Sequence, residues 1–308
     1  MSQELDFQQL KVYFGDNLID FSDAKLPIAS SAVLYGLSVY SVFAVRKTAD
    51  GMKAFRLPDH FTRLIESAKI IGIDDFAKKW DYEKFEKAVS QLVSENNIDQ
   101  DVFIRCSVHV DTLVAGTKSR GLNSVLSMFI YPYKSILPEA GARIKTSVWR
   151  RVPDNSIPPR AKVNGAYINS VLGKQDALDS GYDDCLFLDM AGHVCELSAA
   201  NIFLVKNGVL ITPDSTSDLL EGINRKTIIE YAKDLGIKVE QRTVDLTELY
   251  IADELFACGT SAWLTPITEV DGRKIDSGNH ILSNKLSKLH LDTLSGKSKY
   301  SDKLLTKL

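Results

Sequence analysis

The chain has 308 residues, of which 44% are hydrophobic and 25% charged, as expected for a globular protein of about two domains. Its net charge of -3 argues against a nucleic-acid-binding surface. No apolar stretch approaches the roughly 20 residues that span a bilayer, and the start, MSQELDFQQL, lacks the features of a signal peptide. We therefore expect a cytoplasmic protein with free cysteine thiols and with neither nucleic-acid nor membrane partners.

The first part of the chain mixes short strands with helices of regular apolar spacing. Two strands are predicted around the turn at Gly15-Asp16-Asn17, and a helical turn at Ala32–Gly36. Further strands are predicted at Val39–Arg46, Met52–Arg56, Asp101–Val110 and Ser124–Tyr133, and helices at Leu57–Ile71 and Lys84–Ser94. The pattern weakens around Pro132–Gly141. We predict a small N-terminal domain over residues 1–134, a linker over 135–141 and a larger C-terminal domain over 142–308.

The second part begins with a predicted strand at Ala142–Val152 and a helix at Ile168–Leu178. Two hairpins follow, with turns at Ala191-Gly192 and Asn207-Gly208. Next come a helix at Glu221–Leu235 that ends before Gly236, and a strand at Glu254–Cys258. Because strands and helices do not alternate regularly, we predict an α+β protein with two unlike halves.

Several familiar site motifs are absent from the sequence. There is no G-x-G-x-x-G, Walker A loop, G-x-S-x-G or H-E-x-x-H, and no paired histidines. We therefore predict no metal site.

Lys162 lies in the stretch IPPRAKVNGAYINSVLGKQDAL, just ahead of a predicted helix. A cation is disfavoured at a helix N-terminus, so the position raises two alternatives. Lys162 is either an ordinary solvated lysine or an amine kept partly uncharged for imine chemistry.

Glu196 ends an apolar strand in GHVCELSAANIFLV, where it is either exposed at the strand end or buried with a partner. Two turns of small residues, Gly222-Ile223-Asn224 and Gly259-Thr260-Ser261, are either ordinary caps or sites that bind phosphate through backbone amides. A lysine, a carboxylate and a phosphate site together are the groups that pyridoxal 5'-phosphate (PLP) requires.

Four longer stretches resemble motifs of the class IV, or fold type IV, PLP-dependent aminotransferases, above all the branched-chain amino acid aminotransferases. They occur along this chain in the same order as in that family. They are WRRVPDNSIPPRAKVNGAY, ELSAANIFLVKNGVLITP, LLEGINRKTI and ADELFACGTSAWLTPI. The resemblance implies a two-domain α+β fold like that of D-amino acid aminotransferase, with the cofactor between the domains.

The resemblance also implies the roles of individual residues. Lys162 matches the Schiff-base lysine and catalytic base, Glu196 the partner of the pyridine nitrogen, and Tyr167 the partner of the phenolic oxygen. Phosphate contacts are expected from Arg63, Ile223, Asn224 and Thr260, although Asn224 stands where a threonine is usual. Arg105 matches an arginine that can receive a substrate carboxylate, and the other expected pocket residues are Tyr35, Tyr40, Tyr131, Thr260 and Ser261.

One segment departs from the pattern of the branched-chain enzymes. Their V-F-E-G-I-R-like run is replaced by Val39-Tyr40-Ser41-Val42-Phe43-Ala44, which lacks the glutamate, the glycine and the arginine. The substrate is therefore open among relatives of this fold, which include D-amino acid and (R)-amine transaminases and 4-amino-4-deoxychorismate lyase. Ser41 could serve proton transfer in a lyase or be a simple strand serine.

The leading hypothesis is transamination between a branched-chain L-amino acid and 2-oxoglutarate by a ping-pong mechanism. A protein that binds PLP without turnover is the non-enzyme alternative. The resemblance also implies a homodimer in which the loop Thr112–Asn123 reaches toward the neighbour's active site.

Overall fold

The computed structural model describes residues 5–275 and 280–308, which form two compact units. The first unit comprises Met1–Tyr133, Ala161–Gly165 and Asp292–Leu308, and the second comprises Lys134–Arg160 and Ala166–Leu291. This division differs from the expected boundaries, because residues 161–165 and the C-terminal residues join the first unit. Residues 135–141 lie within the second unit rather than between the two.

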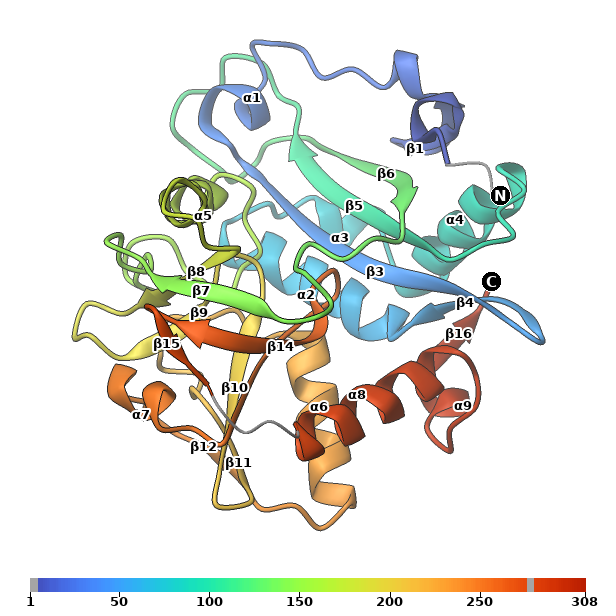
Figure 1. Ribbon diagram of the computed structural model, residues 1–308. Helices are drawn as coiled ribbons and strands as arrows, with labels where there is room; N and C mark the ends of the chain where they lie inside the picture. Colours follow the sequence, from blue (N-terminus) through green and yellow to red (C-terminus); the bar gives the residue numbers. More distant parts are fainter. Residues whose placement is uncertain (1–4, 276–279) are drawn as a thin grey trace. The chain divides into compact units, whose positions relative to one another are not determined.

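A seven-stranded sheet in the order β16-β4-β3-β5-β6-β1-β2 forms the first unit (Figure 1). Its strands are β1 (Lys11–Phe14), β2 (Asn17–Asp20), β3 (Ser38–Thr48), β4 (Gly51–Phe55), β5 (Val102–Val110), β6 (Ser124–Pro132) and β16 (Leu305–Lys307). Its helices are α1 (Ser31–Tyr35), α2 (Leu57–Ile70), α3 (Phe76–Lys79), α4 (Tyr82–Glu95) and α9 (Ser301–Leu304).

Helices α2 and α4 cover one face of this sheet. In α2, Phe61, Leu64 and Ala68 are buried at helical spacing. Asp81 caps α4 by accepting a hydrogen bond from the Lys84 amide. From β3, the ring of Phe43 contacts Phe85 of α4 at a centroid distance of 6.4 Å. The odd-numbered residues of β3 therefore point toward the helices, because side chains alternate along a strand.

The antiparallel register of β3, β5 and β6 shows which residues lie on the other face of this sheet. Tyr40 pairs with Ser107, and Val42 pairs with Arg105. On the next strand, Arg105 pairs with Phe129. Directly opposed residues share a face, so Tyr40, Arg105 and their partners lie on the face away from α2 and α4.

A nine-stranded sheet forms the second unit, with β15 paired to β14 beside the order β12-β11-β10-β13-β14-β7-β8-β9. Its strands are β7 (Ala142–Thr146), β8 (Asp184–Leu188), β9 (Val194–Leu197), β10 (Asn201–Lys206), β11 (Val209–Thr212), β12 (Val239–Gln241), β13 (Glu254–Gly259), β14 (Trp263–Val270) and β15 (Arg273–Lys274). Its helices are α5 (Tyr167–Asp179), α6 (Ile223–Asp234) and α7 (Leu246–Tyr250), and α8 (Ile281–Leu294) crosses the unit boundary at Asp292.

Local turn chemistry explains both hairpins of the second unit. Asn207 and Gly208 have φ angles of 50° and 76°, the left-handed values that a two-residue hairpin turn requires. Gly192 has a φ angle of 97° in the turn between β8 and β9. A buried apolar cluster that includes Ile202, Leu204 and Leu255 lies beneath these strands.

The α+β class is confirmed, and most predicted elements are present with small shifts at their ends. The predicted strand at Ala142–Val152 is shorter, since β7 ends at Thr146. The chain also contains α3 and β16, which the apolar spacing did not reveal. None of the helices in the described ranges has the length and apolar character needed to cross a bilayer.

Candidate active site

Lys162 lies in a short non-helical segment that forms an isolated bridge with the beginning of β3. The Tyr40 amide donates to Lys162 O and the Asn164 amide donates to Ser38 O, both at 2.9 Å, on either side of a bridge between Val39 and Val163. As the sequence predicts, Lys162 lies a few residues ahead of a helix, since it precedes the first residue of α5 by five positions. The bonds to β3 hold its backbone in place.

This pairing places Lys162 on the face of the sheet that carries Tyr40. The Lys162 ammonium lies 4.8 Å from the centroid of the Tyr40 ring, and the Arg105 guanidinium lies 3.6 Å from the same centroid. Tyr131 lies on this face of β6, opposite Phe103. Four of the predicted site residues are thus on one face of one sheet.

Arg63 is held by a residue from the opposite face of β3. Its Nη2 donates to Ser41 Oγ at 3.0 Å, and Ser41 Oγ lies 2.8 Å from His60 Nδ1. Both Ser41 and His60 are fully buried. Because Ser41 alternates with Tyr40 along β3, it points away from the Lys162 face.

Two histidines of the first unit are held neutral. Burial, followed by the charges of Arg63, Lys162 and Arg56, lowers the pKa of His60 well below its ordinary value. Burial and the charge of Arg105 lower the pKa of His109 to about 4, and its Nε2 lies 2.9 Å from Ser127 Oγ. Neither ring is therefore an additional cation at neutral pH.

In the second unit, Glu196 is buried and has several partners. Its Oε1 lies 2.7 Å from Arg151 Nη2. Its Oε2 accepts from Asn201 Nδ2 at 3.1 Å and from the Leu220 amide at 3.2 Å. Of the two alternatives, the structure supports the buried and paired carboxylate. A buried carboxylate requires a cation and donors of this kind around it.

The first turn of α6 presents backbone amides close to this carboxylate network. Gly222 is the N-cap, so Ile223 and Asn224 are the first two helical residues, whose amides have no partner within the helix. The side-chain Oδ1 of Asn224 is buried and has no hydrogen-bond partner in the described chain. The backbone N–H groups of this first turn can donate to an anion, whereas the Asn224 oxygen is an acceptor that needs a donor from elsewhere.

The other small-residue turn lies between β13 and β14. Thr260 and Ser261 are half-buried in it, and Ser261 O accepts from the Ile136 amide at 2.9 Å. A Cβ added to Gly259 would lie 3.3 Å from Ala199 O, so glycine lets this turn approach the loop that follows Glu196. Tyr167, half-buried, is the first residue of α5.

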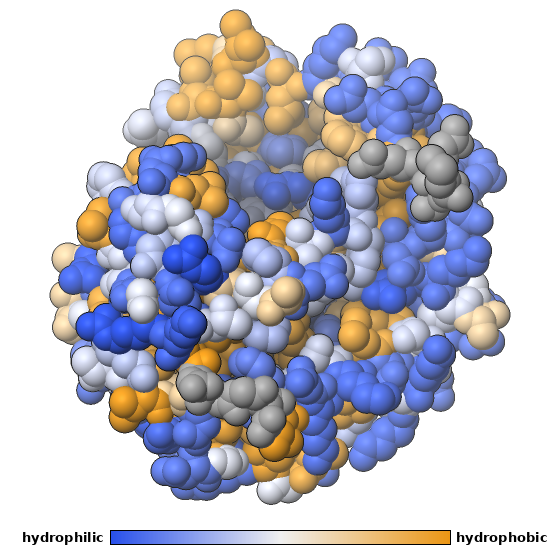
Figure 2. Space-filling view, viewed as in Figure 1, coloured by the Kyte–Doolittle hydropathy of each residue, from blue (hydrophilic) through white to orange (hydrophobic). Residues whose placement is uncertain are grey.

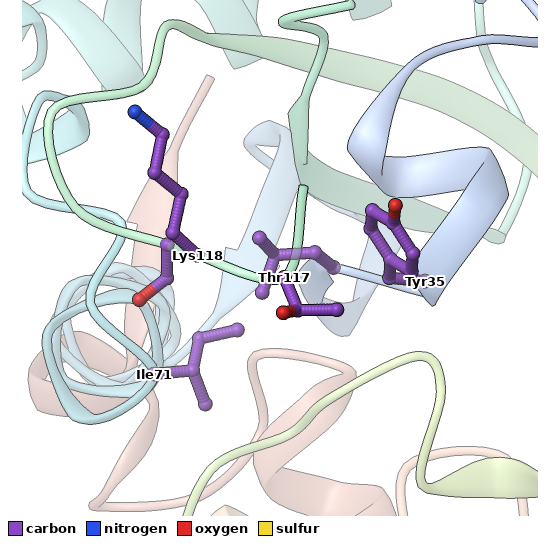
Figure 3. Close-up of a pocket in the computed structure, with 6 residues that line it drawn as sticks. Tyr35, Ile71, Thr117 and Lys118 are labelled. Carbon is purple, nitrogen blue, oxygen red and sulfur yellow. The ribbon is translucent and has the colours of Figure 1, made fainter. Parts of the chain in front are cut away.

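Tyr35 is the last residue of α1 and is exposed. It lines a pocket of about 350 Å³ in the first unit, together with Leu37, Ile71, Thr117, Lys118 and Ser119 (Figure 3). Figure 3 shows the ammonium end of Lys118 pointing away from the Tyr35 ring.

The predicted site residues are divided between the two units. Lys162, Arg63, Tyr35, Tyr40, Arg105 and Tyr131 belong to the first, and Glu196, Tyr167, Ile223, Asn224, Thr260 and Ser261 to the second.

Comparison with known proteins identifies the family. The sequence model described as Amino-transferase class IV matches residues 41–270. The chain belongs to the class IV aminotransferases. Its similarity to branched-chain enzymes extends over most of its length. The branched-chain-amino-acid aminotransferase of Pseudomonas aeruginosa is 35% identical over 292 residues, which cover 93% of this chain and 94% of the relative.

Solved structures agree with this assignment of the aminotransferase to fold type IV. The branched-chain aminotransferase of Thermoproteus uzoniensis with norvaline superposes with a TM-score of 0.91 at 34% identity, covering 96% of this chain and 98% of that one. The branched-chain amino acid aminotransferase of Thermobaculum terrenum in its PLP form has a TM-score of 0.89 at 29% identity, covering 98% of this chain and 99% of that one.

Sequence reasoning missed several residues of this aminotransferase that contact the predicted site residues or their neighbours. Arg151 and Asn201 hold Glu196, His60 contacts Ser41, and Asn164 contacts Arg105. Arg151 and Asn201 lie inside the stretches that carry the resemblance, but their pairing with Glu196 depends on how these stretches fold together. No local sequence signal marks it.

Proposed function

We propose that this aminotransferase transfers amino groups between branched-chain L-amino acids (leucine, isoleucine and valine) and 2-oxoglutarate in a ping-pong cycle, with PLP as cofactor. The observation that carries the proposal is Lys162 above the Tyr40 ring on a sheet face that also holds Arg105. Similarity to branched-chain enzymes over nearly the full chain supports the substrate class.

The residues present fit PLP. Arg151 pairs with Glu196, the proposed partner of a protonated pyridine nitrogen, and its positive charge favours the carboxylate form. The proposed phosphate ligands are the backbone amides of Ile223 and Asn224 in the first turn of α6, together with Arg63 and Thr260. Tyr167 is the proposed partner of the cofactor's phenolic oxygen. The solved Thermobaculum terrenum relative is in its PLP form, which supports the same cofactor here.

Lys162 is the proposed catalytic residue. When bound, PLP supplies an aldehyde that condenses with amines and a ring that takes up the electron pair released at the substrate Cα. Lys162 would hold the cofactor through its side-chain amine. The same amine would take up and return the proton of the substrate Cα, acting as general base and acid.

The face around Lys162 offers separate surfaces for the two substrates. Val42, Phe129 and Tyr131 are apolar neighbours of Arg105 in the strand register and suit a branched side chain. The guanidinium of Arg105 suits the side-chain carboxylate of glutamate or 2-oxoglutarate. The Tyr40 ring contacts both Arg105 and Lys162. Thr260 and Ser261 are proposed to contact the substrate as well.

A lyase role for Ser41 is not favoured. Its hydroxyl is fully buried on the helix side of β3 and is engaged with His60 and Arg63. It therefore supports a proposed phosphate ligand rather than facing the amine of Lys162.

A homodimer is also part of the proposal. In the first unit, α1 and the loop Thr112–Asn123 expose Val33, Leu34, Leu113 and Val114, with Val114 77% accessible. Figure 2 shows a hydrophobic cluster at the top of the view, over α1. In the second unit, α5 exposes Ile168, Val171 and Leu172. Exposed apolar surfaces of this kind are typical of association sites, and light scattering would test for the dimer.

A half-reaction panel tests the proposed function. L-leucine, D-alanine and an (R)-amine are added separately to the PLP-loaded enzyme without an oxo acid, and the visible absorbance of the cofactor is followed. We expect L-leucine to bleach the absorbance, and 2-oxoglutarate to restore it. Bleaching by D-alanine or the (R)-amine alone would contradict the substrate assignment. Pyruvate release from 4-amino-4-deoxychorismate would identify a lyase instead.

A further inference from the structure

Asn164 connects the segment of Lys162 to Arg105. Its Oδ1 accepts from Arg105 Nη2 at 2.7 Å, and its Nδ2 donates to Ser38 Oγ at 2.6 Å. Its backbone amide donates to Ser38 O at 2.9 Å. Since Arg105 can only donate, the orientation of this side-chain amide is fixed by chemistry. Asn164 thus has both ends of its side chain engaged.

The strand register shows why Arg105 needs such a partner. Arg105 lies opposite Val42, whereas Asn164 lies opposite Ser38, four residues earlier along β3. To reach Asn164, the Arg105 side chain crosses the Tyr40 ring, where its guanidinium lies 3.6 Å from the centroid. Stacking sets the plane of the guanidinium against the ring but leaves it free to rotate within that plane.

The bond to Asn164 removes that freedom. A guanidinium carries five N–H donors, and within the described residues Asn164 supplies its single side-chain hydrogen bond. The remaining donors are available for a bidentate contact with a carboxylate. A neutral amide also leaves the full positive charge on Arg105, which an aspartate at this position would offset.

We propose that Asn164 is a positioning residue that sets substrate specificity by orienting Arg105 for the side-chain carboxylate of the dicarboxylic substrate. This inference rests on the role of Arg105 in the proposed function. It predicts that Asn164 acts on glutamate and 2-oxoglutarate selectively, because a branched aliphatic side chain makes no hydrogen bond to a guanidinium.

The test compares single-turnover half-reactions of the PLP-loaded enzyme with L-glutamate and with L-leucine. For Asn164→Ala, we expect the ratio of kcat/KM for glutamate over leucine to fall by roughly tenfold or more, the worth of a hydrogen bond to a charged group. The fall should be in the apparent affinity for glutamate. Asn164→Asp, which has nearly the same shape, should lower the ratio further, and it keeps the test valid if the alanine variant folds poorly.

Two controls separate positioning from general structural damage. In an Arg105→Ala background, Asn164→Ala should change the ratio no further, since the group it orients is gone. Asn96→Ala removes an equally bonded asparagine of the same unit, which holds Lys11 and Leu92, and should leave the ratio unchanged.

Two results would overturn the inference in different ways. An unchanged ratio in Asn164→Ala, with a lowered ratio in Arg105→Ala, removes Asn164 from specificity and leaves the proposed function standing. An unchanged ratio in both variants overturns the inference together with the carboxylate role of Arg105.

Discussion

Arg151 and Glu196 form a buried ion pair in which Nη2 and Oε1 are 2.7 Å apart, with side-chain exposures of 12% and 7%. Asn201 and the Leu220 amide occupy the other carboxylate oxygen. The second unit therefore contains a carboxylate whose charge is stabilised before any ligand arrives. This is the property that a partner for a pyridinium nitrogen needs.

Removing Arg151 should destabilise the protein strongly. Arg151→Met leaves Glu196 buried without its cation, and the free energy of unfolding should fall by about 3–5 kcal/mol. Urea denaturation of the cofactor-free protein measures this change. The double variant Arg151→Met/Glu196→Gln should recover much of the loss, because no unpaired charge remains. Equal losses in the single and double variants would show that the guanidinium acts mainly through packing.

Lys162→Ala should abolish both the visible absorbance of the bound cofactor and transamination. The reason is that the amine at this position is the proposed site of covalent attachment and of proton transfer. Absorbance spectra and leucine turnover check the two effects together. Lys69→Ala, which removes an exposed lysine from the same unit, is the matched control and should keep both. Full turnover in Lys162→Ala would refute the assignment.

Gly222→Ala should disturb the Glu196 network through a steric overlap. The added Cβ would overlap Asn201 Oδ1, although the φ angle of -66° at Gly222 suits any residue. We expect a loss of about 1–3 kcal/mol in unfolding free energy and weaker PLP binding. Urea denaturation and cofactor titration measure both. In an Asn201→Ala background the same substitution should cost little more, and an undiminished cost there would rule out this overlap as the cause.

His109 and His60 should make the protein less stable in acid. Because burial lowers the pKa of His109 from 6.5 to about 4, the unfolded chain binds a proton in this range that the folded chain does not. Stability therefore rises with pH across this window and falls as the pH drops through it, by about 3 kcal/mol for His109. The lowered pKa of His60 acts in the same direction.

His109→Gln tests this pH dependence. The glutamine can still bond to Ser127 but does not titrate, so the slope of unfolding free energy against pH between 4 and 6.5 should become shallower. Denaturation series at several pH values measure the slope. An unaltered slope would mean that His109 contributes no proton uptake on unfolding.

Much of the local structure could be predicted from the sequence because its causes are local. The turn at Asn207-Gly208 forms a hairpin since these residues adopt positive φ angles at low cost. The apolar spacing of Phe61, Leu64 and Ala68 predicted α2. Short elements such as α3 and β16 lack such a signal, because packing against the rest of the unit decides whether four or three residues become regular.

The sequence by itself determined the family and the chemically capable side chains, since the stretches around Lys162 and Glu196 are specific and their residue types suit one cofactor. Only the tertiary structure decided which residues act on them. Strand register turned Tyr40 toward Lys162 and Ser41 toward His60, and the folding of distant segments brought Asn164 to Arg105 and Arg151 to Glu196. These pairings join residues far apart in the chain. A shift of one position in the pairing of β3 would exchange the faces on which Tyr40 and Ser41 lie, and no local sequence signal indicates that register.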